Sequence, residues 1–162
     1  FAEEETTLEA AIGKLLLEKS LTLGTAESCT GGLVAQRITS VAGASAYFLG
    51  GVVAYSNELK KQLLGVSEAT LAAYGAVSEE TVREMAEGTR TRLGVDVAVA
   101  TSGIAGPGGG TPAKPVGTMW LACATPQGTV ARQLNFDRGR DLNVSYTAQS
   151  ALALLWQQLR GL

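Results

Sequence analysis

Segments with helical and with strand-like patterns alternate along this chain, and that order constrains the fold more than any other feature. Helices are expected near residues 6–19, 30–40, 57–65, 67–75 and 78–94, and strands near 21–26, 50–55 and 95–102. Residues 116–124 and 129–136 alternate in polarity around a Pro-Gln-Gly turn, which indicates a β-hairpin, and residues 141–159 have the pattern of an amphipathic helix. Helices that alternate with strands predict a layered α/β fold, and the hairpin makes its sheet mixed. We therefore expect a three-layer α/β/α sandwich.

The length and composition are those of one globular domain. The chain has 162 residues, of which 46% are apolar and 17% charged, so it can bury a sizeable core. It begins at Phe1 and not at Met, so we expect a domain taken from a longer protein. Residues 1–5 are interpreted as the end of a linker, and residues 6–162 as the domain. Thr6 and Glu9 have the spacing of a capping box at the first helix.

The charge and the cysteine count exclude several classes of function. A formal net charge of −2, with scattered Lys and Arg, argues against direct nucleic-acid binding, and no apolar run has membrane-spanning length. Cys29 and Cys123 are too few for a disulfide framework, so a cytoplasmic location is expected. Without histidine or a cluster of acidic residues, we expect no metal and no cofactor. The long amphipathic helices favour a homodimer.

Three expected strands are followed by polar or glycine-rich segments, at 25–32, 55–60 and 101–110. Ligands of α/β sheets bind beyond the carboxyl ends of the strands. In the first segment a strand turns into a helix, which presents backbone N–H groups to an anion or to a developing oxyanion. Because the chain has no histidine, acid–base chemistry at this edge needs another group.

Ser28 is the leading candidate nucleophile, and Lys60 is the best candidate base. If Asn57 caps the helix near residues 57–65, Lys60 lies in its first turn, where the helix dipole and burial both favour a neutral amine. A Ser–Lys pair is a known substitute for Ser–His catalysis. The alternatives are that Ser28 and Thr30 only cap the next helix and that Lys60 is solvated. Tyr55 either relays a proton or is a core aromatic.

Two further features allow more than one interpretation. Cys29 is a rival nucleophile near the same helix start, but a buried thiol that faces the core is favoured. The segment 101–110 is either a cradle for a ligand or a flexible loop, and it matches neither a P-loop nor a dinucleotide fingerprint. Lys114 and Arg140 are candidate partners for a phosphate or carboxylate, or ordinary surface charges.

Four motifs carry a resemblance to a known family. They are TAESCTGG (25–32), AYSNELK (54–60), GAVSEETVREMA (75–86) and SGIAGPGGGTPAKPVGT (102–118). In this order and spacing, over nearly the whole chain, they resemble the CinA C-terminal domain family, the nicotinamide-nucleotide amidohydrolases. The resemblance implies hydrolysis of the carboxamide of nicotinamide mononucleotide to nicotinic acid mononucleotide and ammonia, in the recycling of pyridine nucleotides.

The resemblance also implies roles for single residues. It makes Ser28 the nucleophile and assigns Lys60 and Tyr55 to the same catalytic set. We expect substrate contacts from Glu27, Thr30, Gly31, Gly32, Asn57, Thr101, Ser102, Gly103, Gly106, Gly108, Gly109 and Arg140.

One position departs from the family pattern. The family commonly has Gly-Asp-Arg at the start of the last helix and a second arginine four residues later. Arg140 matches the first arginine, and Val144 occupies the position of the second. This departure motivates a second hypothesis, in which the domain binds a nucleotide without converting it and serves as a regulatory module of a competence- or damage-related protein.

Overall fold

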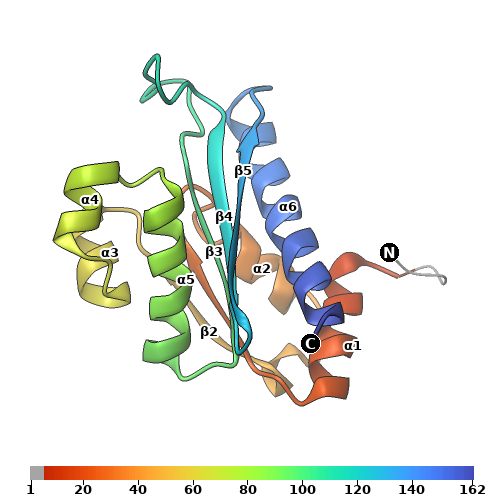
Figure 1. The fold of residues 1–162 in the computed structure, drawn as a ribbon. Coiled ribbons are helices and arrows are strands. Elements are labelled where there is room, and N and C mark those ends of the chain that lie inside the picture. Colours follow the sequence, from red (N-terminus) through yellow and green to blue (C-terminus); the bar gives the residue numbers. More distant parts are fainter. Residues whose placement is uncertain (1–5) are drawn as a thin grey trace.

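Within residues 6–162, five strands form one mixed sheet in the order β2-β1-β3-β4-β5 (Figure 1). The computed structural model describes residues 6–162, so the expected linker end at residues 1–5 lies outside the described residues. The strands are β1 (Leu23–Glu27), β2 (Phe48–Val53), β3 (Val97–Gly103), β4 (Thr118–Thr125) and β5 (Gly128–Asn135). β1 pairs in parallel with β2 and β3, and β4 pairs antiparallel with β3 and β5. The predicted mixed sheet and its hairpin are confirmed.

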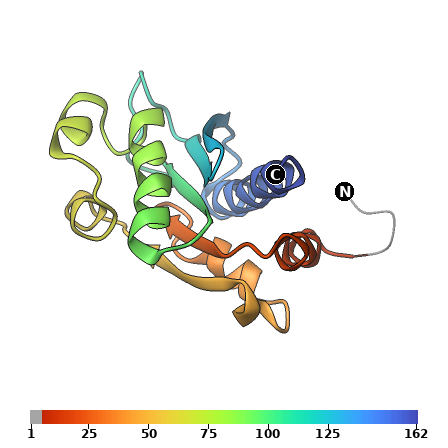
Figure 2. The same ribbon diagram turned by 60° about the horizontal axis from the view of Figure 1, so that its bottom comes forward.

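Helices cover both faces of this sheet. They are α1 (Leu8–Lys19), α2 (Leu33–Thr39), α3 (Asn57–Leu64), α4 (Glu68–Tyr74), α5 (Glu79–Leu93) and α6 (Arg140–Arg160), with a short 3₁₀ turn at Ala44–Ala46. Figures 1 and 2 show α1, α2 and α6 on one face, with α5 on the other and α3 and α4 outside it. The three-layer α/β/α sandwich is therefore confirmed. No helix within residues 6–162 is both long and apolar enough to cross a bilayer.

A separate apolar cluster lies on each face of the sheet. On one face, leucines of α1 and α6, such as Leu16 and Leu155, pack on Leu23 and Leu121 of the strands. On the other face, α5 contributes the buried residues Val82, Met85 and Ala86. Burial of each large apolar side chain stabilises the fold by roughly 1.5–3 kcal/mol, so the two clusters fix the sheet that positions the strand ends.

Two helix caps differ by one residue from the expected positions. Thr7 caps α1 in place of Thr6, and its hydroxyl accepts a hydrogen bond from the Ala10 N–H at 3.1 Å. Ser56 caps α3 in place of Asn57, and its Oγ accepts from the Leu59 N–H at 3.1 Å. Both differences have one cause. In each case two adjacent residues are good N-caps, and the backbone conformation determines which of them caps the helix.

The close approach of α3 to α5 depends on Gly88. A Cβ at Gly88 would overlap the carbonyl oxygen of Leu64 at the end of α3. In an unobstructed helix, Gly→Ala stabilises by about 1 kcal/mol. We expect Gly88→Ala instead to lower the free energy of unfolding by about 1–3 kcal/mol, because the two helices must separate. Urea titration measures this change.

Gly50→Ala is the matched control for this experiment, because a Cβ at Gly50 meets open space. Its free energy of unfolding should change by less than about 0.5 kcal/mol. A Gly88→Ala variant as stable as the parent would contradict the close packing of α3 on α5.

Candidate active site

The carboxyl ends of β1, β2 and β3 meet at one edge of the sheet. Glu27, the last residue of β1, is in register with Val53 of β2 and Thr101 of β3. The polar segments that follow these strands therefore leave the sheet side by side. The segment 104–117 extends past this edge at the top of Figure 1. The structure thus brings together the three segments from which the sequence predicts a site.

Ser28 and Lys60 meet directly at this edge. The Lys60 Nζ donates a hydrogen bond to the Ser28 Oγ at 3.1 Å and another to the Tyr55 carbonyl oxygen at 3.2 Å. Lys60 is 1% exposed and Ser28 is 8% exposed. Within residues 6–162, no carboxylate forms an ion pair with Lys60. Burial lowers the pKa of Lys60, because the charged amine is desolvated and has no counter-ion.

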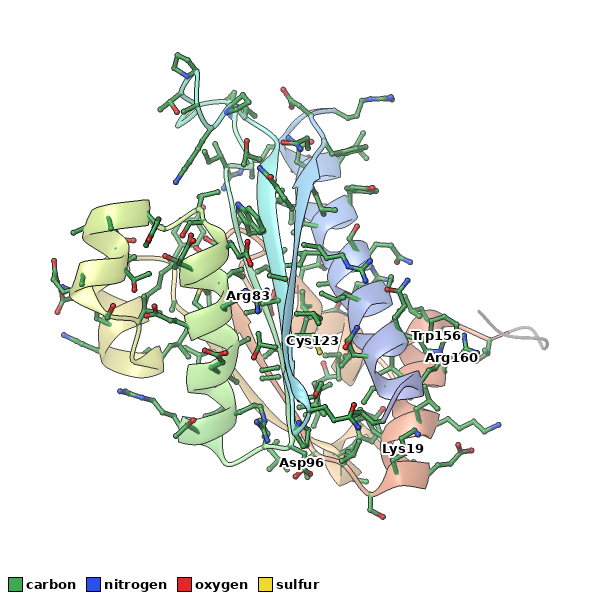
Figure 3. The ribbon with its side chains drawn as sticks, viewed as in Figure 1. Lys19, Arg83, Asp96, Cys123, Trp156 and Arg160 are labelled. Carbon is green, nitrogen blue, oxygen red and sulfur yellow. The ribbon has the colours of Figure 1, made fainter. Side chains whose placement is uncertain are left out.

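Cys29 faces the opposite layer of the molecule. It is buried in a small apolar cluster with Ala105, Met119 and Val144, on the side of α6. Burial raises the pKa of its thiol to about 12. Cys123, in the middle of the sheet (Figure 3), is also buried, and its pKa is likewise raised to about 12. The interpretation of Cys29 as a buried, core-facing thiol is confirmed.

Glu27 occupies the helix start from which the sequence predicts an anion site. Its Oε1 accepts from the Gly32 N–H at 3.2 Å and the Val34 N–H at 2.8 Å, and its Oε2 accepts from the Ala35 N–H at 3.0 Å. The Glu27 side chain is 1% exposed. This is a correction to the expected substrate contact: the anion held at the start of α2 belongs to the protein itself.

Thr30 and Thr101 also lie beneath the turn. The Thr30 Oγ1 donates to the Glu27 Oε1 at 2.6 Å and lies 2.8 Å from the Thr101 Oγ1. Both threonines are buried, and their hydroxyls bond to each other and to Glu27. Gly31 and Gly32 follow Thr30 in the turn, with φ of 59° and 110°. A Cβ at Gly31 would meet open space.

Arg140 connects three segments at the rim of the site. Its Nη1 donates to the Gly106 carbonyl oxygen at 2.6 Å, and its Nη2 donates to the Tyr55 hydroxyl at 3.0 Å. Tyr55 is 59% exposed, which is contrary to a core aromatic. Its hydroxyl bonds to Arg140, and only its backbone carbonyl contacts Lys60. Gly108, Gly109 and Asn57 are exposed at the same end of the molecule.

Three residues of the glycine-rich region have structural partners. The buried Ser102 Oγ donates to the Ala76 carbonyl oxygen at 2.7 Å, and a Cβ at Gly103 would overlap the Met119 sulfur. The Lys114 Nζ donates to the Tyr74 carbonyl oxygen at the end of α4. These contacts fix the segment 104–117 near both of its ends. It overlaps the segment 101–110, which the sequence alone leaves open between a cradle and a flexible loop.

Asn143 is a buried residue of this region that the sequence reasoning missed. Its Nδ2 donates to the Ala105 carbonyl oxygen at 3.0 Å, and its Oδ1 accepts from the Arg138 N–H at 2.8 Å. It therefore joins the glycine-rich segment to the start of α6. The sequence does carry a signal that Asn143 is buried, because Asn143 lies about one helical turn before Thr147 on the buried face of α6.

The fold and the site define a class of protein, a three-layer α/β domain with a buried serine–lysine pair at the carboxyl edge of its parallel strands. The model of the CinA C-terminal domain family matches residues 5–159. This chain belongs to that family.

Known relatives agree with this membership. A CinA-like protein of Geobacter sulfurreducens is 51% identical over 158 residues, which cover 98% of this chain and 38% of the relative. A crystal structure of a competence-damaged protein (CinA) superfamily protein from Klebsiella pneumoniae has a TM-score of 0.92 and 36% identity, over 96% of this chain and 97% of that one. The competence/damage inducible protein of Agrobacterium tumefaciens has a TM-score of 0.88 and 38% identity, over 99% of each chain. This chain spans about two fifths of the length of the curated relatives.

Proposed function

We propose that this domain is an amidohydrolase that converts nicotinamide mononucleotide to nicotinic acid mononucleotide and ammonia, with Ser28 as nucleophile and Lys60 as base. The observation that carries the proposal is the 3.1 Å contact between the Lys60 Nζ and the Ser28 Oγ in a buried position. Membership of the CinA C-terminal domain family and the four motifs quoted above support the choice of substrate.

In the first step the Ser28 Oγ attacks the carboxamide carbon while neutral Lys60 takes the hydroxyl proton. A neutral amine is required, and burial of Lys60 lowers its pKa toward that form. A new C–O bond forms, and the carbonyl π electrons move onto the oxygen, which becomes an oxyanion.

The oxyanion needs donors in the turn that follows Ser28. The N–H groups from Gly31 to Ala35 all have acceptors, in the backbone or in the Glu27 carboxylate. We therefore place the oxyanion donors at the two preceding N–H groups, those of Cys29 and Thr30. This differs from the sequence-based expectation of the helix start itself.

In the second step the tetrahedral intermediate collapses, the C–N bond breaks, and ammonia leaves with the proton that Lys60 accepted. Water then attacks the acyl ester on Ser28, and neutral Lys60 takes a proton from that water. The ester C–O bond breaks, and the Ser28 oxygen regains a proton. Tyr55 lies at the rim, so its part in this proposal is to contact the substrate with Arg140.

Arg140 is the group in this proposal that holds the phosphate. It is exposed, and its guanidinium already contacts both the glycine-rich segment and Tyr55. In this proposal the phosphate binds there and the carboxamide lies at the Ser28–Lys60 pair. A charged hydrogen bond to Arg contributes about 1.5–3 kcal/mol.

Ammonia release from three amides tests the proposal. We expect nicotinamide mononucleotide to be hydrolysed with a kcat/KM about 10- to 100-fold above that of nicotinamide riboside, because the riboside lacks the phosphate that Arg140 binds. Nicotinamide should react still more slowly. A Ser28→Ala sample prepared in the same way controls for contaminating amidases.

Two results would contradict the proposal. Equal turnover of the mononucleotide and the riboside would contradict the proposed phosphate contact of Arg140. Binding of the mononucleotide in calorimetry, without any ammonia release, would support the regulatory nucleotide-binding module instead.

A further inference from the structure

We propose that Glu27 is a positioning residue that determines which of two adjacent nucleophiles, Ser28 or Cys29, meets Lys60. This inference rests on the proposed function, because it concerns the same turn. It extends that function by giving a role to a buried carboxylate that contacts neither the Lys60 amine nor an open surface.

The main chain and the side chain of Glu27 hold the turn from different sides. Its carbonyl oxygen accepts from the Ala54 N–H at 2.9 Å, which joins it to the end of β2, and the Ser28 N–H donates to the Thr101 carbonyl oxygen at 3.1 Å. Its carboxylate binds the first N–H groups of α2. The turn that carries both nucleophiles is therefore fixed to the sheet at one end and to the helix at the other.

The direction of the hydrogen bonds follows from the number of donors. Four donors converge on the two Glu27 oxygens, an arrangement that suits an ionised carboxylate, which only accepts. The single Thr30 hydroxyl proton is therefore used on Glu27. The Thr101 hydroxyl must then donate to Thr30 across the 2.8 Å contact.

The charge of Glu27 also acts on the residues around it. The chain of bonds runs from Thr101 through Thr30 to Glu27, so the negative charge of Glu27 orients both hydroxyl donors in it. Burial and, to a smaller extent, the Glu27 charge raise the pKa of the neighbouring Cys29 thiol.

The turn that Glu27 fixes separates the two nucleophiles. Cys29 is held among Met119 and Val144 on the side of α6, while Ser28 meets Lys60 of α3 on the other side. Without the Glu27 charge, the order of donors is lost and the turn is no longer fixed to α2. We therefore expect the loss of that charge to lower the reactivity of Ser28 and to raise that of Cys29.

Glu27→Gln tests this inference, because it keeps the size of the side chain and replaces one acceptor oxygen by a donor group. The kcat for nicotinamide mononucleotide should fall about 10- to 100-fold, since the Ser28–Lys60 pair loses its alignment. The KM should stay within about threefold, because the Glu27 carboxylate has no substrate contact. Alkylation of Cys29 by iodoacetamide, located by peptide mass mapping, should become faster. Cys123 provides an internal reference, since its alkylation rate should not change.

Glu9→Gln is the matched control. Glu9 is an acid of α1 that pairs with Arg37 at 2.9 Å, away from the turn. This variant should leave kcat and the alkylation of Cys29 unchanged. If Glu27→Gln does not fold, Thr30→Val interrupts the same chain while the bonds from Glu27 to α2 remain, and it should also accelerate alkylation of Cys29.

Amide hydrogen exchange separates this inference from the proposed function. The Val34 and Ala35 amides should be protected in the parent and less protected in Glu27→Gln, whether or not the protein releases ammonia. Absence of ammonia release by the parent would overturn the proposed function alone. Unchanged exchange and alkylation in Glu27→Gln, or a raised KM with unchanged kcat, would overturn the positioning role.

Discussion

Replacement of Ser28 by alanine is expected to reduce ammonia release from nicotinamide mononucleotide by at least about 10³-fold. Loss of a nucleophile leaves only binding and the oxyanion donors to accelerate the reaction. The Ser28 hydroxyl bonds to the Lys60 amine, so its removal deletes one group of the pair and leaves the turn supported by Glu27. A coupled ammonia assay at saturating substrate measures the loss, and calorimetric titration checks that substrate still binds.

Cys29→Ala, at the next residue, distinguishes the two nucleophiles. Its thiol has a pKa raised to about 12 by burial and lies in the opposite layer, so activity should remain within about tenfold of the parent. If Ser28→Ala stayed active and Cys29→Ala were dead, the nucleophile assignment would be wrong by one residue.

The meeting of Ser28 and Lys60 was predictable because it depends on topology. Helical and strand periodicities give the order of elements, and parallel strands bring their carboxyl ends to one edge. Lys60 then lies in the first turn of the helix that follows β2, close to the end of β1. The cap at Ser56, one residue before the expected Asn57, does not alter this placement.

The role of Glu27 was not predictable from the sequence. A turn rich in small polar residues before a helix indicates an anion site, and the structure does have an anion there. Whether that anion is a ligand or a side chain depends on whether the start of α2 lies within reach of the Glu27 carboxylate. Tertiary packing decides this, and the local sequence does not. The hydrogen bond from Arg140 to Tyr55 was not predictable from the local sequence either, because it joins residues 85 positions apart.

Replacement of Lys60 by methionine, which keeps the length and the burial of the side chain, is expected to lower kcat about 10²- to 10⁴-fold, because the Ser28 hydroxyl loses its general base. Lys61→Met is the matched control. Lys61 forms surface ion pairs with Glu58 and Glu68, which contribute little, so activity should change less than twofold. An active Lys60→Met variant would rule out Lys60 as the base.

The pH dependence of kcat/KM in the parent and in Lys60→Met shows whether the Lys60 amine acts as a base or has only a structural role. In the parent, kcat/KM should rise with pH as Lys60 loses its proton, with a midpoint below the ordinary lysine pKa because burial lowers it. The free energy of unfolding also depends on the protonation of Lys60. Between the lowered folded pKa and the ordinary unfolded pKa, the unfolded chain binds one more proton, so the free energy of unfolding rises with pH across that window and is lower below it. Lys60→Met should lack both slopes in rate profiles and urea titrations, and a variant that keeps the slope in kcat/KM would assign the base to another residue.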